Sequence, residues 1–478
     1  MVVIKKKLSN NNIINTFFEP VLNDNTPKWL VIKEKQSFEV PDGKNIKDII
    51  KNPEDLETKK EIDVLPSGLW QCLKCGGQTQ ADKKPIHCPH CNRDTHFENI
   101  TKIINQDLWK LPYWKDIPVE DLDMLNTYND TIEIVKKLLV LPDDTLYKIF
   151  TLWIISTWKT GHWDAVAFPI FRGEYSTGKT TALDIIRELG YRMIHSAGTT
   201  FPAMIRGTHY YQAGLLIDEA SDRLDRRTET GRELLNFVKP SYRRGSVYTV
   251  ADKEDQEEML CYKNFGFKAF AGERHFDPAL LSRGIDFVMQ EDYPEIPSIK
   301  YVQDELNNLQ TKFLNYRYKT TAPPDLGMDF CLRGRLRETF ESIIATGMHI
   351  GLNVDDIIEY AKSIKQEREE ELLGTIEYDV ILAINKLSQQ DIQSTITGET
   401  DAPEHILYTD IFKEVFPDYE EFDKGERKKK GAKIGYTIKN LHLKKKRLGI
   451  GTVLVLNDNK NSRRLNYLYK KYKLVVNS

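Results

Sequence analysis

Residues 173–180 read Gly-Glu-Tyr-Ser-Thr-Gly-Lys-Thr, and this stretch decides how the chain folds. The residues before it, 165–171, are apolar and partly aromatic, as in a buried strand. The residues after it, 181–189, place apolar side chains at helical spacing. A glycine-rich loop between a strand and a helix predicts a βα unit of an α/β fold.

The spacing Gly-x-x-x-x-Gly-Lys-Thr is that of a phosphate-binding loop and predicts an ATP site. Gly173 and Gly178 permit backbone angles and a close approach that a Cβ atom would prevent. Lys179 is expected to reach the β- and γ-phosphates, and the Thr180 hydroxyl to bind Mg²⁺. The nucleotide-binding residues predicted here are Gly173, Glu174, Tyr175, Ser176, Thr177, Gly178, Lys179, Thr180 and Thr181.

A second motif, residues 214–219, is an apolar segment that ends in two carboxylates. Asp218 is expected to hold the Mg²⁺ shell, and Glu219 to orient and polarise the attacking water. A strand over 191–196 and a helix over 200–206 fit one intervening βα unit. An acid pair that only caps the next helix is the alternative, and the spacing of the two motifs argues against it.

The composition is that of a folded globular chain. At 478 residues it should hold several domains, and 40% hydrophobic residues with a net charge of −3 exclude a disordered protein. No signal segment opens the chain, and the most apolar run, 149–158, is too short to span a bilayer, so it predicts a buried helix. We therefore expect a cytoplasmic protein with no membrane partner.

Four of the six cysteines form two C-x-x-C pairs and predict a zinc ribbon over residues 67–98. The ligands would be Cys72, Cys75, Cys88 and Cys91. Four thiolates leave no open position, so Zn²⁺ would be structural, and its affinity of about 10–16 kcal/mol would supply most of the ribbon's folding energy. A nucleic-acid contact and a purely structural or protein-contact role both stay open.

Residues 1–66 carry no chemical motif, and a strand or hairpin is expected over 29–40. Residues 99–145 are expected to be a helical connector, and residues 146–316 the ATPase core. Within the core, 246–250 and 259–262 predict a hairpin. The candidate nucleic-acid contacts in and before its turn are Arg243, Arg244 and Lys253. The turn is mostly acidic, which argues against a simple basic loop, and a solvated turn is the alternative.

At residues 276–285, Phe-Asp-Pro-Ala-Leu-Leu-Ser-Arg-Gly-Ile, the chain resembles the AAA+ superfamily. The Leu-Leu-Ser-Arg run looks most like the arginine finger of MCM-type helicases. The stretch 168–290 is also similar to the ATPase domains of primase-associated helicases of plasmids and phages. The resemblance implies that Arg283 reaches the γ-phosphate of a neighbouring subunit; pairing with an acid of its own domain is the alternative. The chain departs from the family at 271–272, where Ala-Gly stands in place of the usual polar residue.

Two domains are expected after the core. Helices over 326–372 would form a lid, in which Arg335 or Arg337 is either a second nucleotide-sensing arginine or an exposed residue of an amphipathic helix. Residues 373–478 look like a winged helix with three helices, a third-helix core of Ile434, Ile438 and Leu441, and a wing over 452–468. We expect Lys433, Thr437, Asn440 and Lys444 to face outward.

The end of the chain is strongly basic. From residue 424 to 478 there are seventeen Lys and Arg against two acids, a net charge of +15, which leaves −18 on the rest. This asymmetry predicts contact with the DNA backbone, with weak sequence discrimination because lysines bind phosphates as point charges. The candidate contacts are Lys433, Lys439, Lys444, Arg463 and Arg464.

These features together predict an AAA+ P-loop core with a parallel sheet and helical lid, an N-terminal zinc ribbon and a C-terminal winged helix. The predicted activity is that of an ATP-dependent DNA helicase in the replication of a mobile element or its host. It would work as a homo-hexamer, with a separate primase as a further partner. A loader or initiator that does not unwind, and a nucleotide-sensing DNA-binding regulator, are the alternatives. The choice of DNA or RNA, the polarity and the ring size stay open.

Overall fold

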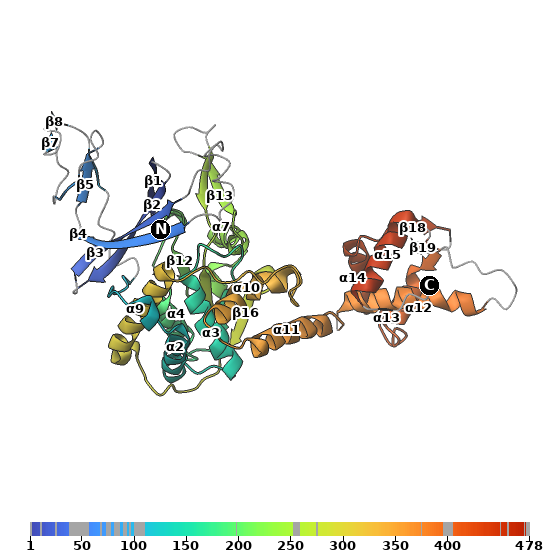
Figure 1. Ribbon diagram of the computed structural model, residues 1–478. Coiled ribbons are helices and arrows are strands. Elements are labelled where there is room, and N and C mark those ends of the chain that lie inside the picture. The colour runs from blue at the N-terminus through green and yellow to red at the C-terminus, as the bar shows by residue number, and fades with distance from the viewer. Residues whose placement is uncertain are drawn as a thin grey trace. The chain divides into compact units, whose positions relative to one another are not determined.

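The computed structural model describes most of the chain after residue 109 and a set of strands before it. Before residue 110 the described stretches are 2–9, 12–23, 26–37, 57–66, 69–72, 78–80, 87–88, 93–94 and 97–99. After it the gaps are 197, 252–258, 274–275, 374, 395–404, 450, 457, 473 and 475–478. The chain divides into two compact units, Met1–Ala361 and Lys362–Ser478 (Figure 1).

A five-stranded parallel sheet forms the centre of the first unit. Its strands are β10 (Phe168–Arg172), β11 (Met193–His195), β12 (Gly214–Ile217), β15 (Lys268–Gly272) and β16 (Gly284–Val288). Their order is β11-β12-β15-β10-β16, and every pairing is parallel. The strand that precedes the glycine-rich loop therefore lies inside the sheet. The predicted α/β class and parallel sheet are confirmed, and the arrangement is consistent with a P-loop AAA+ core.

Helices cover both faces of this sheet, which is why its strands are apolar along their length rather than alternating. The covering helices include α3 (Asp144–Thr157), α4 (Lys179–Leu189), α5 (Phe201–Tyr211) and α7 (Glu229–Val238). Phe168 and Ile170 share one apolar cluster with residues of α5 and α7. Phe171 faces the other way and packs edge-on against Phe150 of α3. The predicted buried helix over 149–158 is confirmed as the apolar part of α3, since 149–157 are all buried.

Other elements surround this core. They are η2 (Val119–Asp121), α2 (Met124–Leu138), α6 (Ala220–Arg223), η3 (Lys239–Tyr242), the hairpin β13 (Val247–Ala251) and β14 (Met259–Lys263), α8 (Pro278–Leu281), η4 (Ile299–Val302), α9 (Gln303–Lys319), α10 (Gly334–His349) and α11 (Asp355–Leu373). The predicted hairpin is confirmed by the antiparallel pairing of β13 with β14. Lys253, in its turn, lies outside the described residues.

The first 66 residues contain more structure than the expected single strand or hairpin. They form a four-stranded antiparallel sheet of β1 (Val2–Ser9), β2 (Asn12–Asn23), β3 (Thr26–Ser37) and β4 (Glu57–Pro66). Val21, Leu30 and Ile32 are buried, as is Glu19 of β2. A carboxylate with no exposed surface needs a charged partner, and Glu19 finds one in the core, as described below.

Short strands surround the cysteine motifs. They are β5 (Leu69–Cys72), β6 (Gln78–Gln80), β7 (His87–Cys88), β8 (Arg93–Asp94) and β9 (Phe97–Asn99). β5 pairs with β6, and β7 with β8, so each C-x-x-C run begins where a strand ends and lies between two antiparallel strands. Cys75 and Cys91 lie outside the described residues, and of Cys72 and Cys88 only the backbone is described.

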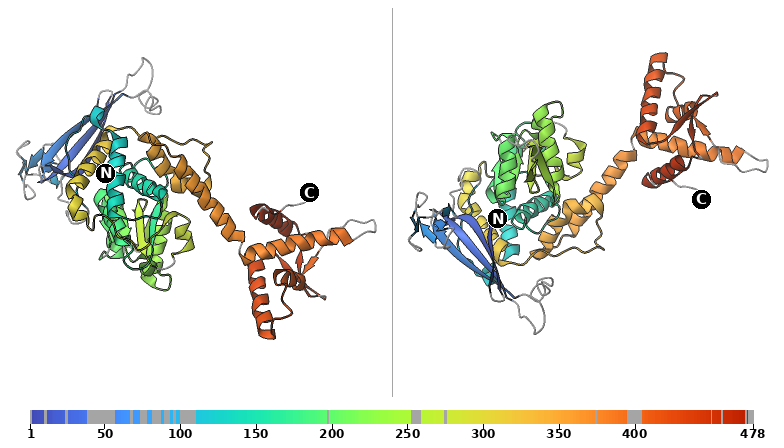
Figure 2. Two further views of the ribbon diagram at one scale, coloured as in Figure 1. Left: turned by 90° about the horizontal axis from the view of Figure 1, so that it is seen from below. Right: turned by 90° about the horizontal axis from the view of Figure 1, so that it is seen from above.

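The second unit contains helices around a small antiparallel sheet (Figure 2). Its elements are α12 (Ile376–Ser394), β17 (His405–Leu407), α13 (Tyr408–Val415), α14 (Lys424–Asn440), β18 (Lys445–Leu448), β19 (Gly451–Val455) and α15 (Asn459–Lys471). The three strands are ordered β17-β19-β18. Ile434, Ile438 and Leu441 lie in the core of this unit, as predicted.

Two expectations for this unit were wrong. Residues 463–468 belong to helix α15 rather than to a wing strand, and the hairpin is formed by β18 and β19 instead. Leu465, Leu468 and Tyr469 are buried at helical spacing, so these apolar residues follow a period of 3.6 rather than 2. Thr437 is buried rather than outward-facing, because it lies beside Ile438 on the core side of α14.

No helix in the described part of the chain is both long enough and apolar enough to cross a bilayer.

Candidate functional site

The glycine-rich loop is shaped by two different steric requirements. Gly178 has a φ of 83°, in the left-handed region that glycine adopts without strain, and caps the start of α4. At Gly173 a Cβ atom would lie 2.6 Å from the Met289 carbonyl oxygen and 2.7 Å from Thr177 Oγ1. One glycine is therefore needed for its backbone angle, and the other for close packing against the segment that follows β16.

Lys179 and Thr180 are the first two residues of α4 and follow the loop directly. Lys179 Nζ donates to the Gly173 carbonyl oxygen at 2.9 Å and to that of Glu174, so its ammonium group lies against the loop. Thr180 Oγ1 donates to Asp218 Oδ2 at 3.0 Å. This contact brings together the two motifs that were predicted separately, because β10 and β12 end at the same edge of the sheet.

Glu219 follows Asp218 with a φ of 52°, which is uncommon for a residue with a side chain. Its backbone N–H donates to Asp218 Oδ1 at 2.9 Å, and its side chain is exposed. It precedes α6 but makes no side-chain capping hydrogen bond to that helix. The alternative in which Glu219 serves as a cap therefore has no support from its side chain.

The loop opens onto a cavity of about 570 Å³. Its walls are Leu138, Leu139, Val140, the loop residues 176–181, and Glu291, Asp292, Tyr293, Pro294 and Pro297. The wall residues outside 176–181 were not found by sequence reasoning. The segment 138–140 precedes the loop by more than thirty positions and has no motif of its own, so only the packing of α2 reveals it.

Arg283 lies at the opposite end of β10 from the loop. Its carbonyl oxygen accepts from the N–H of Phe168, the first residue of β10, whereas the loop follows the last residue, Arg172. At about 3.3 Å per residue, the strand separates the two by roughly 13 Å. Arg283 therefore lies at the edge of the sheet opposite to its own phosphate loop.

Arg283 and Arg335 both lie beside Tyr242. Their guanidinium carbons are 5.2 Å and 5.4 Å from the centre of the Tyr242 ring. Burial lowers the pKa of Arg283, and the nearby positive charge of Arg335 lowers it further. Among the described residues no carboxylate forms an ion pair with either arginine, and Arg283 Nε is buried without a partner. Arg337 differs, because it donates to the Gly327 carbonyl oxygen at 2.6 Å and to Glu341 at 3.1 Å.

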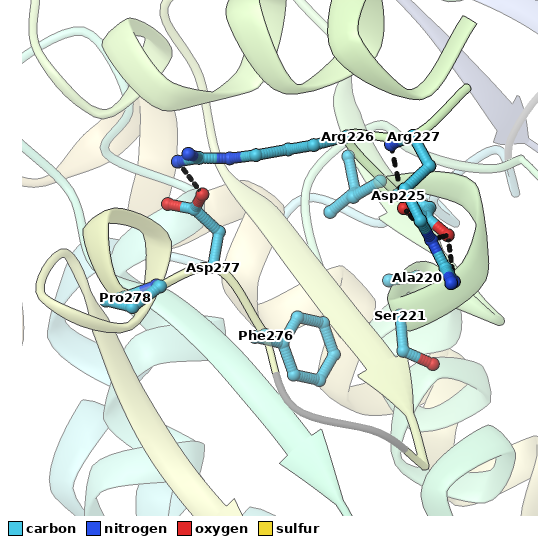
Figure 3. A pocket seen from close by; sticks show the side chains of 9 residues that line it. Ala220, Ser221, Asp225, Arg226, Arg227, Phe276, Asp277 and Pro278 are labelled. Carbon is cyan, nitrogen blue, oxygen red and sulfur yellow. Dashed lines mark hydrogen bonds and ion pairs between the residues drawn. The ribbon is translucent and has the colours of Figure 1, made fainter. Parts of the chain in front are cut away.

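A second, smaller cavity of about 360 Å³ lies between the helix after Glu219 and the helix before Arg283. Figure 3 shows Arg226 reaching across it to Asp277. Asp277 also lies 3.5 Å from Lys239 and accepts from the Ala279 N–H at 2.9 Å, which caps α8. Its carboxylate thus fixes the start of the short helix that precedes Arg283.

The candidate nucleic-acid residues of the core are in different situations. Arg244 donates to the carbonyl oxygens of Trp163 at 2.8 Å and Thr160 at 3.0 Å, so its guanidinium is held by the core itself. Arg243 is 66% exposed, with Glu338 at 3.5 Å. Arg244 is 42% exposed, so Arg243 is the more exposed of the two arginines.

The basic residues of the second unit also differ from one another. Lys433 and Lys439 are exposed on α14, and Arg463 is exposed on α15. Lys444 forms an ion pair with Asp458 at 3.2 Å, and Arg464 donates to the Leu441 carbonyl oxygen at 3.0 Å. The structure thus leaves three of the five predicted contacts without a carboxylate or carbonyl partner in the described residues.

The described residues contain no group of three or more His, Cys, Asp or Glu side chains that could hold a metal ion. The side chains of the four motif cysteines are not among them. The zinc site therefore stays a prediction, as does the Mg²⁺ site, for which Thr180 and Asp218 are adjacent.

No family model matches this chain, and no curated protein matches it. Among solved structures it is similar to the active helicase SCCmec type IV Cch, with 12% identity, 95% of each chain covered and a TM-score of 0.32. Drosophila ORC bound to DNA is 12% identical over 75% of this chain and 95% of that one, with a TM-score of 0.20. Cdc6p from Pyrobaculum aerophilum is 10% identical over 72% and 98%, with a TM-score of 0.20. Likeness at this level carries no argument about activity, so the function has to be argued from the residues themselves.

Proposed function

We propose that this chain is an ATPase of the AAA+ type that moves along DNA and separates its strands. The observation that carries the ATPase assignment is the 3.0 Å hydrogen bond between Asp218 and Thr180, which with the rest of the phosphate loop lines the cavity. If the two motifs form one nucleotide site, Thr180 and Asp218 must lie close together. A chance glycine turn would not bring them together.

The residues fit the chemistry of phosphoryl transfer. Lys179 would bind the β- and γ-phosphates, and Thr180 with Asp218 would hold Mg²⁺. That ion, when bound, would neutralise charge that develops on the phosphate oxygens. Glu219, exposed and adjacent to Asp218, would orient the attacking water. The apolar wall of 138–140, with Tyr293 and Pro294 also lining the cavity, would hold the base of the nucleotide.

Arg283 would act on the nucleotide of a second copy. It lies at the far edge of the sheet from its own loop and lacks a carboxylate partner among the described residues, as does Arg335 beside it. Arg283 Nη1 donates to the Ala279 carbonyl oxygen and Arg335 Nη1 to Ser282 Oγ at 3.5 Å, so neither charge is neutralised by these contacts. Two guanidinium groups without a carboxylate partner in the described residues, beside one tyrosine, would form a receptor for an anion such as a γ-phosphate. This supports a homo-oligomeric ring, which we propose to be hexameric, and it favours a role for Arg335 together with Arg283 rather than at its own loop.

The second unit would bind DNA as a winged helix. Its order of helix, strand, two helices and a hairpin supports this proposal, as do the exposed cations of α14. In the N-terminal part, the strand ends at Cys72 and Cys88 support a zinc ribbon in which each C-x-x-C run occupies a turn between paired strands. A lid formed by α10 and α11, and a separate primase as partner, also stay proposals.

The deciding experiment measures ATP turnover of the purified chain without nucleic acid, with single-stranded DNA and with a forked duplex, and scores strand separation in the same samples. Stimulated turnover with separated strands supports the helicase. Stimulated turnover without separation would indicate a loader or initiator, and turnover that ignores DNA would indicate a nucleotide-sensing regulator. Lys179→Ala should abolish turnover, whereas Arg206→Ala, an exposed cation on α5, should not.

A further inference from the structure

The exposed face of α14 carries two side chains that can recognise more than charge. Ile434 and Ile438 are fully buried and define the inner side of the helix. The exposed residues of its second half are Ala432, Lys433, Tyr436, Lys439 and Asn440. Tyr436 and Asn440 are one turn apart, and with Lys429 and Lys433 they follow the spacing i, i+4, i+7, i+11 of a single stripe along the helix.

Tyr436 and Asn440 have no partner within the described unit. Tyr436 is 67% exposed, and neither side chain makes a hydrogen bond or ring contact with another described residue. Tyr467, also exposed in this unit, differs because the Arg464 guanidinium lies 5.0 Å from its ring centre. An amide and a phenol on a lysine-rich face, both without internal partners, are available to a ligand that the lysines attract.

The position of the stripe is fixed by the hairpin. Lys445 Nζ, at the start of β18, donates to the Gly435 carbonyl oxygen at 2.9 Å. At Gly435 a Cβ atom would lie 3.0 Å from Tyr408 Oη, so the helix also approaches α13 closely at this turn. These contacts hold the turn of α14 that carries Tyr436 between the sheet and α13. The exposed cations Lys446 and Arg447 follow Lys445 on the same strand.

We propose that Tyr436 and Asn440 contact base edges when this unit lies on duplex DNA, and that Asn440 selects an adenine. This rests on the proposed DNA binding of the unit. Lysines contact phosphates and carry no sequence information, whereas an asparagine amide can donate to N7 and accept from N6 of adenine at the same time in the major groove. The unit would thus combine non-specific affinity from its lysines with a preference set by two residues.

The test selects sequences from a pool of random duplexes with the full-length chain at a fixed salt concentration. Binding of the enriched duplex is then compared with that of a scrambled duplex of equal composition. We expect an adenine at one enriched position and a preference of about tenfold or more for that duplex. Asn440→Ala should remove the preference and leave both the affinity for the scrambled duplex and its salt dependence unchanged. Tyr436→Ala should weaken the preference in the same way.

Matched controls separate base contact from general surface change. Asn466→Ala and Tyr467→Ala change an exposed asparagine and tyrosine on α15 and should keep the preference. Lys433→Ala should weaken the binding of both duplexes equally and lower the salt dependence of the affinity by about one unit of slope. If the chain binds DNA but enriches no sequence, or if the α15 variants lose the preference equally, the proposal of base contacts by α14 is wrong. The proposal that this unit binds DNA would still stand. Failure to bind any duplex would overturn both.

Discussion

Glu19 and Arg192, 173 positions apart in the sequence, form a buried ion pair in which Arg192 Nη2 lies 2.9 Å from Glu19 Oε2. Arg192 Nε also donates to Glu19 Oε1 at 3.0 Å, and the hydroxyls of Tyr191 and Tyr318 donate to Oε2 at 2.6 Å and 2.5 Å. One carboxylate of the N-terminal sheet thus collects four hydrogen bonds from the core. The two parts of the first unit are joined by a fully bonded polar cluster.

Glu19→Ala should lower the free energy of unfolding by about 3–5 kcal/mol, because it leaves Arg192 buried without its partner. Glu19→Gln keeps the shape of the side chain and should lower the free energy of unfolding by less. Urea unfolding measures both, and the double variant with Arg192→Met should recover part of the loss. Equal losses for Ala and Gln, without recovery in the double variant, would show that the charge is not what Glu19 contributes.

We also expect the buried Glu19 carboxylate to make the fold less stable in acid. Burial is the largest single effect and acts to raise the pKa of Glu19, but Arg192, Arg317 and the Tyr191 hydroxyl together act against it, and the pKa lies below the ordinary 4.5. A carboxylate with a lowered folded pKa stabilises the fold above its unfolded pKa, and this contribution is lost as the pH falls through the folded value. Below pH 5 the free energy of unfolding should therefore fall more steeply with decreasing pH in the wild type than in Glu19→Gln.

We expect the buried Lys268 amine to make the stability of the fold change at alkaline pH. It lies fully buried in β15, its Nζ donates to the carbonyl oxygens of Asn264 at 2.8 Å and Gly266 at 3.1 Å, and burial lowers its pKa to about 7. Between about pH 7 and 10 the Lys268 amine binds a proton more strongly in the unfolded chain than in the folded one. The free energy of unfolding should therefore rise with pH by up to about 1.4 kcal/mol per pH unit. Lys268→Met should remove this slope; identical slopes would mean that the ammonium stays charged in the fold.

Glu219→Gln should lower ATP turnover by about 10²–10⁴-fold while nucleotide binding persists, because the amide can still hydrogen-bond water but cannot accept its proton. Turnover and binding of a fluorescent ATP analogue are measured on the same preparation. Asp222→Asn, an acid three residues further on in α6, is the matched control and should keep its activity. A loss of binding equal to the loss of turnover would assign Glu219 to the fold of the site rather than to the water.

Arg283→Ala should lower turnover by about 10³–10⁵-fold if the arginine completes the site of a neighbouring copy. Mixing this variant with Lys179→Ala should restore part of the activity, since some interfaces then combine an intact loop with an intact arginine. Arg335→Ala should be rescued in the same way if both arginines serve one anion. Absence of rescue at every mixing ratio would give Arg283 a structural role within its own subunit.

Metal analysis of the purified chain should find one zinc per chain, and Cys88→Ser should lower that content. Cys261→Ser is the control, because Cys261 is a free exposed thiol on β14. Strong binding by four thiolates means that removal of the metal with a chelator should unfold the ribbon. Full zinc content in the Cys88→Ser chain would move the site to other ligands.

Much of the fold could be predicted because its signals are local. The glycine-rich loop, the apolar strands and the amphipathic helices each express a backbone geometry through a few adjacent residues, so β10, α4, β12 and the β13–β14 hairpin were expected where they occur. Helix α15 was mistaken for a wing strand because its polar surface hides three buried apolar residues at helical spacing. Local patterns also gave no sign of the four-stranded sheet in the first 66 residues beyond a possible strand or hairpin over 29–40.

The sequence by itself determined which residue types could carry chemistry: a lysine and a threonine after a glycine, two acids after a strand, an arginine before the last core strand, and a basic end. Only the tertiary structure decided which of them meet. The 3.0 Å contact of Thr180 with Asp218, the stacking of Arg283 and Arg335 on Tyr242, and the burial of Glu19 against Arg192 all join distant positions. The physical reason is that periodicity encodes the path of the backbone over a few residues, whereas these contacts depend on how the sheet and its helices pack in three dimensions.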